Sequence, residues 1–315
     1  MGKTAISFGE SGMLTRTGRM KGVVMVLAAA VLWGVSGTAA QVLFQYNQFN
    51  PGWLVAVRMM ASGLLLLLAG SLHSGPKQIF RVWVHRKDAF RLVLFSVLGL
   101  LGVQYSYFAS IATGNAATAT LLQYLGPLFI TLYLAVRWRR VPNMWESSSV
   151  VLALIGTVLL VTEGKWHGLS VPAASVVWGL LSALTLAFYT LYPNGLLQRY
   201  GATAVVGWSM IIGGVSMACK NPPWDFVGHG STEAWFLVGF VVVFGTLLAF
   251  YLYLTSLRYI SPSETSVLAC AEPLSAAIVA ILFLHVHMGT MAMLGGLCIL
   301  ATVIILAVER SSYTA

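Results

Sequence analysis

Two ionisable side chains fall inside apolar stretches that are long enough to cross a membrane. Glu272 lies near the centre of the run 264–284, and Arg58 lies in the early part of the run 53–72. A charge at that depth costs about 3 kcal/mol on insertion scales, so such a residue is a functional candidate. Glu272 could bind an amine or carry an exchangeable proton, because burial disfavours the charged form of a carboxyl group.

Both residues also have a purely structural interpretation. Glu272 could pair with Arg58 or with a tyrosine hydroxyl and so only fix the packing of helices. Arg58 lies toward a helix end, from which its side chain could extend to the membrane surface. Contact with a ligand is the other interpretation of Arg58.

Two prolines predict interruptions at similar depth. Pro273 follows Glu272 directly and frees a backbone carbonyl one turn earlier, because proline has no N–H and its ring clashes there. Pro127 occupies the corresponding position in the run 116–137, with Gly126 in place of the glutamate. Irregular backbone at this depth is tolerated where it lines a cavity. We therefore expect a cavity at the two kinks, with one carboxylate in it.

Aromatic residues are the second signal. Tyrosine hydroxyls in hydrocarbon need hydrogen-bond partners, so several are expected to face the interior. A ring-lined cavity could hold an organic cation or an aromatic group, and a nearby carboxylate favours a cationic or zwitterionic ligand. We expect cavity positions for Trp33, Tyr105, Tyr107, Tyr189 and Tyr253, with Gln123 as a polar contact or a bond between helices. Tryptophans near run ends fit the belt at the membrane surface, namely Trp53, Trp83, Trp138, Trp145, Trp166 and Trp235.

The composition requires a membrane around these residues. The chain has 315 residues, of which 58% are hydrophobic and 9% are charged, whereas a soluble domain has about 25% charged residues. A spanning helix needs ~20 apolar residues, so the apolar runs predict an all-α membrane protein with ten transmembrane helices. These runs lie near 22–43, 53–72, 91–112, 116–137, 147–163, 170–196, 203–219, 234–257, 264–284 and 288–308.

The basic residues orient the predicted helices. Fifteen of the 18 Lys and Arg residues fall in the tails 1–21 and 309–315 or in loops on the same side. Because such residues concentrate on the cytoplasmic side, we expect both tails in the cytoplasm and a multi-pass protein of a bacterial plasma (inner) membrane. The positive charge is then an orientation signal, and we expect no nucleic-acid partner.

The chain contains an internal repeat. Residues 99–128 and 245–274 match at a constant offset, without a gap. Each half would hold five helices, an odd number, so the second half enters the membrane from the opposite side. Such inverted repeats around a central cavity occur in many secondary transporters. We place the first repeat at 22–163 and the second at 164–308. The matched pairs are Gly99 with Gly245, Tyr105 with Tyr251, Tyr107 with Tyr253, Ser110 with Ser256 and Pro127 with Pro273.

Four segments resemble EamA-type transporters of the drug/metabolite transporter superfamily. They are VLWGVSGTAAQ (31–41), NAATATLLQYLGPL (115–128), AFYTLYP (187–193) and CAEPLSAAI (270–278). The resemblance implies ten helices in two inverted five-helix halves, a central cavity and, frequently, export of amino acids or related metabolites. Many such transporters carry a glutamate at the cytoplasmic end of the fourth helix and at the outer end of the ninth. This chain reads VRWRRVP and LHVHMG there.

We therefore expect a secondary active transporter that exports small amino-acid-like, amine or aromatic metabolites by alternating access. Proton antiport through Glu272 is the favoured mechanism, and facilitated diffusion or exchange is the alternative to it. The expected partners are a small-molecule substrate and the lipid bilayer, in a monomer or homodimer, with no cofactor and no metal. The alternatives are an intramembrane enzyme acting on lipid, or a channel or sensing scaffold. Catalysis is disfavoured because the predicted spans contain no His or Asp that could assist Glu272.

Overall fold

The computed structural model describes residues 16–139, 141, 143–165, 169–256, 259–260 and 262–314, and every regular element in these ranges is a helix. Eight helices are long and apolar enough to span a membrane, or nine if one bent pair counts as a span. The predicted all-α membrane fold is therefore confirmed. The last predicted span corresponds to a shorter apolar helix over Thr290–Leu306, so the number ten stays a prediction.

The first half of the chain forms five apolar segments. Polar side chains begin three of its helices, because Asn50, Asn115 and Asn143 accept hydrogen bonds from backbone N–H groups that have no partner inside a helix. Two short helices, α3 (Pro76–Phe80) and η1 (Arg81–Trp83), connect the second segment to the third. The five segments are α1 (Arg16–Gln45), α2 (Pro51–Ser74), α4 (Arg86–Leu94) with η2 (Phe95–Leu101) and α5 (Gly102–Thr113), α6 (Ala116–Gln123) with α7 (Gly126–Arg137), and α8 (Met144–Thr162).

The second half follows the same order with one difference. The helix that fills most of the predicted run 170–196 ends at Leu191, because Pro193 cannot donate the next helix hydrogen bond. A short helix follows and meets its successor at a bend of 119°. The elements are α9 (Ala173–Leu191), α10 (Asn194–Tyr200), α11 (Ala202–Ala218), α12 (Thr232–Val242) with η3 (Val243–Leu248) and α13 (Ala249–Ser256), α14 (Pro262–Ala269) with α15 (Ala271–Leu284), and α16 (Thr290–Thr314).

Both halves interrupt their helices at corresponding places. The third segment of each half contains a π-helical turn, which is η2 in the first half and η3 in the second. The fourth segment of each half breaks just before its proline, between α6 and α7 and between α14 and α15. Single π-helical turns occur frequently at functional sites, so these four interruptions locate the region where a site is expected.

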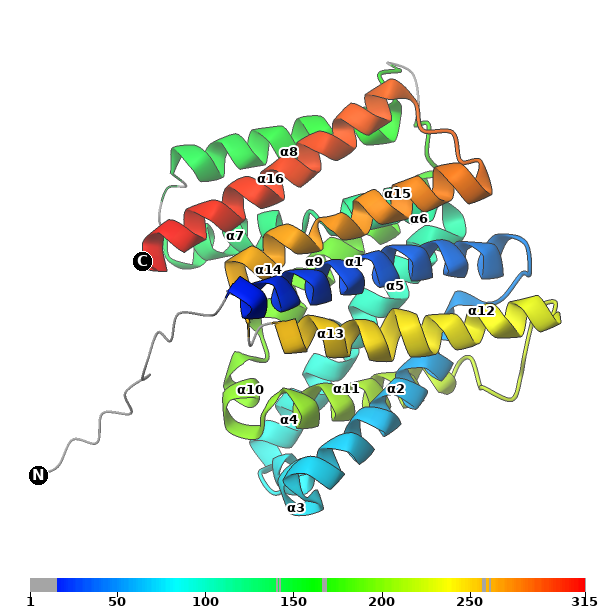
Figure 1. Cartoon of the computed structure of the whole chain (residues 1–315), viewed down its shortest axis with the longest axis vertical. Helices are drawn as coiled ribbons and strands as arrows, with labels where there is room; N and C mark the ends of the chain where they lie inside the picture. The colour runs from blue at the N-terminus through cyan, green and yellow to red at the C-terminus, as the bar shows by residue number, and fades with distance from the viewer. Residues whose placement is uncertain are drawn as a thin grey trace, which may run out of the picture.

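The segments pack as a bundle with two outer pairs. Figure 1 shows α8 beside α16 at one edge and α2 beside α11 at the opposite edge, with α1, α5, α9, α13 and α15 between them. Small residues allow the closest approach, since a Cβ at Gly34 would lie 2.6 Å from the carbonyl oxygen of Glu272. The first turn of α1 and the last turn of α16 lie on the same side of the bundle (Figure 1). That this side is cytoplasmic stays a prediction.

Candidate functional site

A cavity of about 570 Å³ is lined by residues of both halves. This volume falls within the range of small-molecule binding sites. Eight of the ten residues that the sequence singled out line it, and they come from positions spread over most of the chain. These eight are Trp33, Arg58, Tyr107, Gln123, Pro127, Tyr189, Tyr253 and Glu272.

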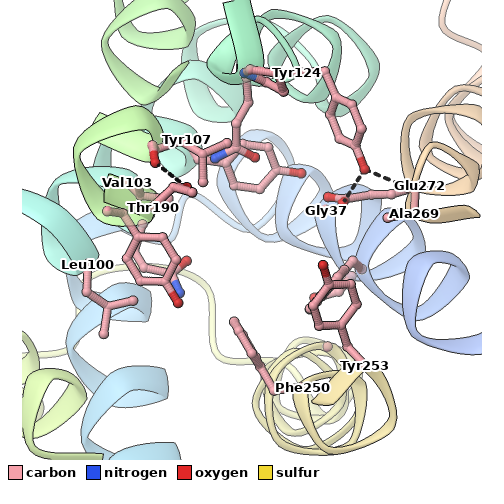
Figure 2. Close-up of a pocket in the computed structure, with 18 of the residues that line it drawn as sticks. Gly37, Leu100, Val103, Tyr107, Tyr124, Thr190, Phe250, Tyr253, Ala269 and Glu272 are labelled. Carbon is pink, nitrogen blue, oxygen red and sulfur yellow. Dashed lines mark hydrogen bonds between the residues drawn. The ribbon is translucent and has the colours of Figure 1, made fainter. Parts of the chain in front are cut away.

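The carboxylate lies at the helix break before Pro273. Because Pro273 has no N–H, the carbonyl of Ala269 has no helix partner. The Tyr124 hydroxyl donates to Ala269 O at 2.6 Å and to Oε2 of Glu272 at 3.2 Å, as Figure 2 shows. Tyr124 belongs to the corresponding break of the first half, between α6 and α7. The two breaks therefore meet at Glu272.

The arginine is buried and does not extend to the membrane surface. Arg58 is 5% exposed, and its Nη2 donates to Oε1 of Gln104 at 3.0 Å. Its guanidinium carbon lies 4.6 Å from the ring centroid of Phe108. Its Nε is a buried donor without a hydrogen-bond partner. A charged donor in this state would form a strong hydrogen bond to an anionic group that entered the cavity.

Of the two structural pairings expected for Glu272, the structure shows one. In the described part of the chain, Arg58 and Glu272 form no salt bridge with each other. Glu272 does pair with a tyrosine hydroxyl, that of Tyr124. Two groups of opposite charge thus line the same cavity, and in the described residues they do not pair with each other.

Aromatic rings form much of the cavity wall. The ring centroid of Trp33 lies 5.2 Å from that of Tyr253 and 5.3 Å from that of Phe250, and Figure 2 shows Phe250 and Tyr253 on one helix. The Tyr107 hydroxyl lies 2.9 Å from Oγ1 of Thr120. Because the threonine hydroxyl already donates to a backbone carbonyl one turn earlier, Tyr107 is the donor.

Two further lining residues are committed to packing between helices. Gln123 donates from Nε2 to the hydroxyl of Ser182 at 2.7 Å, which is the bond between helices that the sequence left open. Tyr189 stacks on Phe95, with ring centroids 5.4 Å apart. Both side chains therefore have fixed orientations in the wall.

Two of the ten predicted residues lie away from the cavity surface. Tyr105 packs edge-on against Trp178 at 5.5 Å, because residues two apart on a helix face different directions and Tyr107 takes the cavity side. The second half repeats this arrangement, since Tyr251 is 64% exposed. Pro273 is buried and does not line the cavity. It affects the site through the helix break and the carbonyl that it frees.

Sequence reasoning missed the partners of the two charged groups. Tyr124 lies within the segment 115–128 but was not selected, and Phe108 carried no signal. The signal for Tyr124 was available, because a freed carbonyl at residue 269 needs a donor and the repeat places the first-half break opposite it.

An aromatic cluster lies at the end of the bundle opposite the first turn of α1. Trp53 was expected in the surface belt, but it is 4% exposed. Its ring contacts those of Phe49, Phe226 and Trp235, and its Nε1 donates to the carbonyl of Pro223 at 3.1 Å. Trp53 lies at the start of α2 and faces the interior, which explains the difference. Trp83, Trp138, Trp145 and Trp235 are 38–63% exposed, and Trp166 lies outside the described residues.

Comparisons with known proteins agree with this architecture. The model of the EamA-like transporter family matches residues 20–162 and 173–308, which confirms the resemblance. The chain is 40% identical over 291 residues to the uncharacterized inner membrane transporter YicL of Salmonella typhimurium, covering 92% of this chain and 96% of that protein. It is 26% identical over 314 residues to the uncharacterized transporter YwfM of Bacillus subtilis, covering 94% of this chain and 98% of that protein. A solved crystal structure superposes on 94% of this chain and on 100% of its own chain, with a TM-score of 0.62. The two sequences are 16% identical, so the similarity is one of fold.

Proposed function

The chain belongs to the EamA-like transporter family, and on that premise we propose that it is a secondary active transporter that exports small amino-acid-like, amine or aromatic metabolites by alternating access. The observation that carries the proposal is the presence of Arg58 and Glu272 in one aromatic-lined cavity, with no salt bridge between them among the residues that the structure describes. A zwitterion would pair with both charges, whereas a simple amine would pair with Glu272 alone.

The hydrogen-bonding capacity left at each charge supports a zwitterionic substrate. In the described residues the Glu272 side chain has one hydrogen-bond partner, Tyr124, and a carboxylate can accept about four bonds. Arg58 has a buried Nε without a partner. A substrate ammonium would donate to the first group and a substrate carboxylate would accept from the second. The aromatic wall would contact the remainder of the substrate.

The contact with Tyr124 supports proton coupling. A hydroxyl has one hydrogen, and Tyr124 lies closer to the carbonyl of Ala269, at 2.6 Å, than to Glu272, at 3.2 Å. When that hydrogen goes to the carbonyl, a protonated Glu272 can donate to the tyrosine oxygen. A protonated carboxyl cannot form an ion pair with an ammonium. Proton and substrate would then exclude each other at Glu272, as proton antiport requires.

The aromatic cluster around Trp53 lies at the end of the bundle opposite the first turn of α1. If the tails are cytoplasmic, this cluster faces outward. The export direction itself comes from the family resemblance, because alternating access is reversible. A membrane enzyme has less support, since the cavity lining holds one carboxylate and no His or Asp as a second catalytic group.

A ligand screen by thermal shift on the purified chain tests the proposal. L-Phenylalanine, phenethylamine and 3-phenylpropionate differ only in which charged groups they carry, and each would be measured on both sides of neutral pH. A ligand at a hundredfold excess over Kd stabilises the folded state by about 2.7 kcal/mol. We expect the largest shift with the zwitterion, dependent on pH and lost in Glu272→Gln. Equal shifts with all three ligands, unaffected by Glu272→Gln, would contradict the proposal.

A further inference from the structure

The connection between α2 and α4 is a structured surface element rich in positive charge. We call residues 76–91, which hold α3, η1 and the start of α4, the basic elbow. It lies at the far end of α2, on the rim of the bundle (Figure 1). Five of its side chains are basic, and all five are exposed to solvent: Lys77, Arg81, Arg86, Lys87 and Arg91.

One face of the basic elbow is fixed to the second half of the chain. Ile79 and Val82 are 2% and 0% exposed. Trp208 of α11 donates from Nε1 to the carbonyl of Ile79 at 2.9 Å, and its ring meets Phe80 and Trp83 edge-on at 5.1 and 5.3 Å. The element therefore has a fixed orientation on the bundle.

The solvent-exposed surface of the basic elbow mixes apolar and basic side chains. Phe80, Val84 and Phe90 are 53%, 74% and 69% exposed, and Trp83 is 38% exposed. They alternate along the chain with the basic residues, directly after a helix long enough to span the membrane. An element with this composition at the end of a span lies at the level of the lipid headgroups.

The positive charge of the basic elbow is largely uncompensated within the protein. Its single acidic residue, Asp88, is 4% exposed and accepts from the Tyr200 hydroxyl at 2.8 Å and from Arg199 Nη1 at 3.1 Å. Arg91 lies 3.6 Å from the second carboxylate oxygen. The four other basic side chains have no salt bridge in the described part of the chain.

We propose that the basic elbow binds the headgroups of anionic phospholipids. Phosphate oxygens accept hydrogen bonds from Lys and Arg, while the exposed aromatic rings enter the boundary between headgroups and acyl chains. Each basic residue near an anionic lipid surface strengthens binding about fivefold. The cavity lining given for the described residues includes none of residues 76–91, so this inference does not depend on the proposed substrate.

Native mass spectrometry of the full chain in detergent tests the site. The protein is titrated with phosphatidylglycerol and, separately, with phosphatidylcholine. The elbow variant is Lys77→Gln with Arg81→Gln. The matched control is Arg137→Gln with Arg139→Gln, which removes the same charge from the exposed end of α7 and the turn that follows it. We expect phosphatidylglycerol binding to weaken on the order of thirtyfold in the elbow variant and to stay near wild type in the control. Added salt should also weaken it.

Three results would overturn the proposal. Equal loss in both variants would assign the effect to net charge and not to the elbow. Equal affinity for phosphatidylcholine would remove the selectivity for anionic headgroups. Equally tight binding of glycerol phosphate, measured by its protection against lipid binding, would identify a site for free phosphate compounds. Since the substituted side chains are exposed, unchanged thermal unfolding checks that both variants fold.

Discussion

We expect Arg58→Met to weaken the binding of a zwitterionic ligand while thermal stability stays unchanged or rises. Methionine keeps an unbranched apolar stem of similar length and removes the charge together with all five N–H donors. A substitution that disrupts a binding site by unfolding it lowers both ligand affinity and thermal stability. A substitution that lowers affinity alone therefore identifies a residue that contacts the ligand.

The expected effect on stability follows from the surroundings of Arg58. Its unpaired Nε costs about 1–3 kcal/mol as an unsatisfied buried donor, and burial of the charge itself costs several kcal/mol more. Against this, methionine loses the bond to Gln104, about 1.5–3 kcal/mol, and the contact with the Phe108 ring, about 0.5–2 kcal/mol. The two sides are similar in size, so Tm should shift upward by no more than a few degrees.

The expected effect on binding follows from the lost charge-assisted hydrogen bond. At about 2 kcal/mol it corresponds to a roughly thirtyfold rise in Kd for L-phenylalanine. Phenethylamine lacks the carboxylate, so its Kd should not change, and Arg58→Lys should retain part of the affinity for L-phenylalanine. Calorimetric titration of both ligands measures these values. The reasoning is refuted if Arg58→Met lowers Tm by many degrees and weakens both ligands equally, because Arg58 would then be a packing residue.

Three further substitutions, two of them with a control, test other parts of the structure. Gly37→Ala would place a Cβ 2.7 Å from the hydroxyl of Tyr107 in the cavity, so we expect slower transport. Its control is Gly239→Ala, whose Cβ would meet no described atom within 4 Å and which should raise the free energy of unfolding by about 0.5–1 kcal/mol. Trp53→Ala removes the central ring of the aromatic cluster, so it should lower Tm and increase substrate leakage from proteoliposomes. Its control is Trp224→Ala, which should change neither quantity because the Trp224 side chain is 85% exposed. Asp88→Asn weakens the contacts to α10 and should cost about 1–3 kcal/mol in denaturant unfolding; an unchanged midpoint would contradict that.

Much of the fold could be predicted because the membrane limits the choices. Composition and run length predicted helices, and the proline positions predicted both breaks, since a missing N–H interrupts a helix wherever it occurs. The π-helical turns could not be predicted, because they depend on packing between segments. Each turn contains one glycine of the repeat, Gly99 or Gly245, but a glycine in an apolar run does not by itself predict a π-helical turn. The end of α9 was misplaced because hydrophobicity continues past Leu191 while the backbone does not.

The candidate site could be predicted in part. Glu272 and Arg58 stood out because charge inside an apolar run is costly, but their partners come from other helices and have no local signal. The choice of Tyr105 was avoidable, since helix periodicity does not allow it to share a face with Tyr107. The burial of Trp53 could not be predicted, because a position near a helix end does not indicate whether the ring faces the lipid or the interior of the bundle.

Uptake of radiolabelled L-phenylalanine, or of the best ligand from the thermal screen, into proteoliposomes with an imposed pH gradient is the most direct test of proton-coupled transport. We expect saturable flux that depends on the pH gradient, with Glu272→Gln still folded but no longer driven by that gradient. We also expect Arg58→Met to raise the half-saturating concentration. Flux that rises linearly with concentration, or that keeps its rate and pH dependence in Glu272→Gln, would contradict the account.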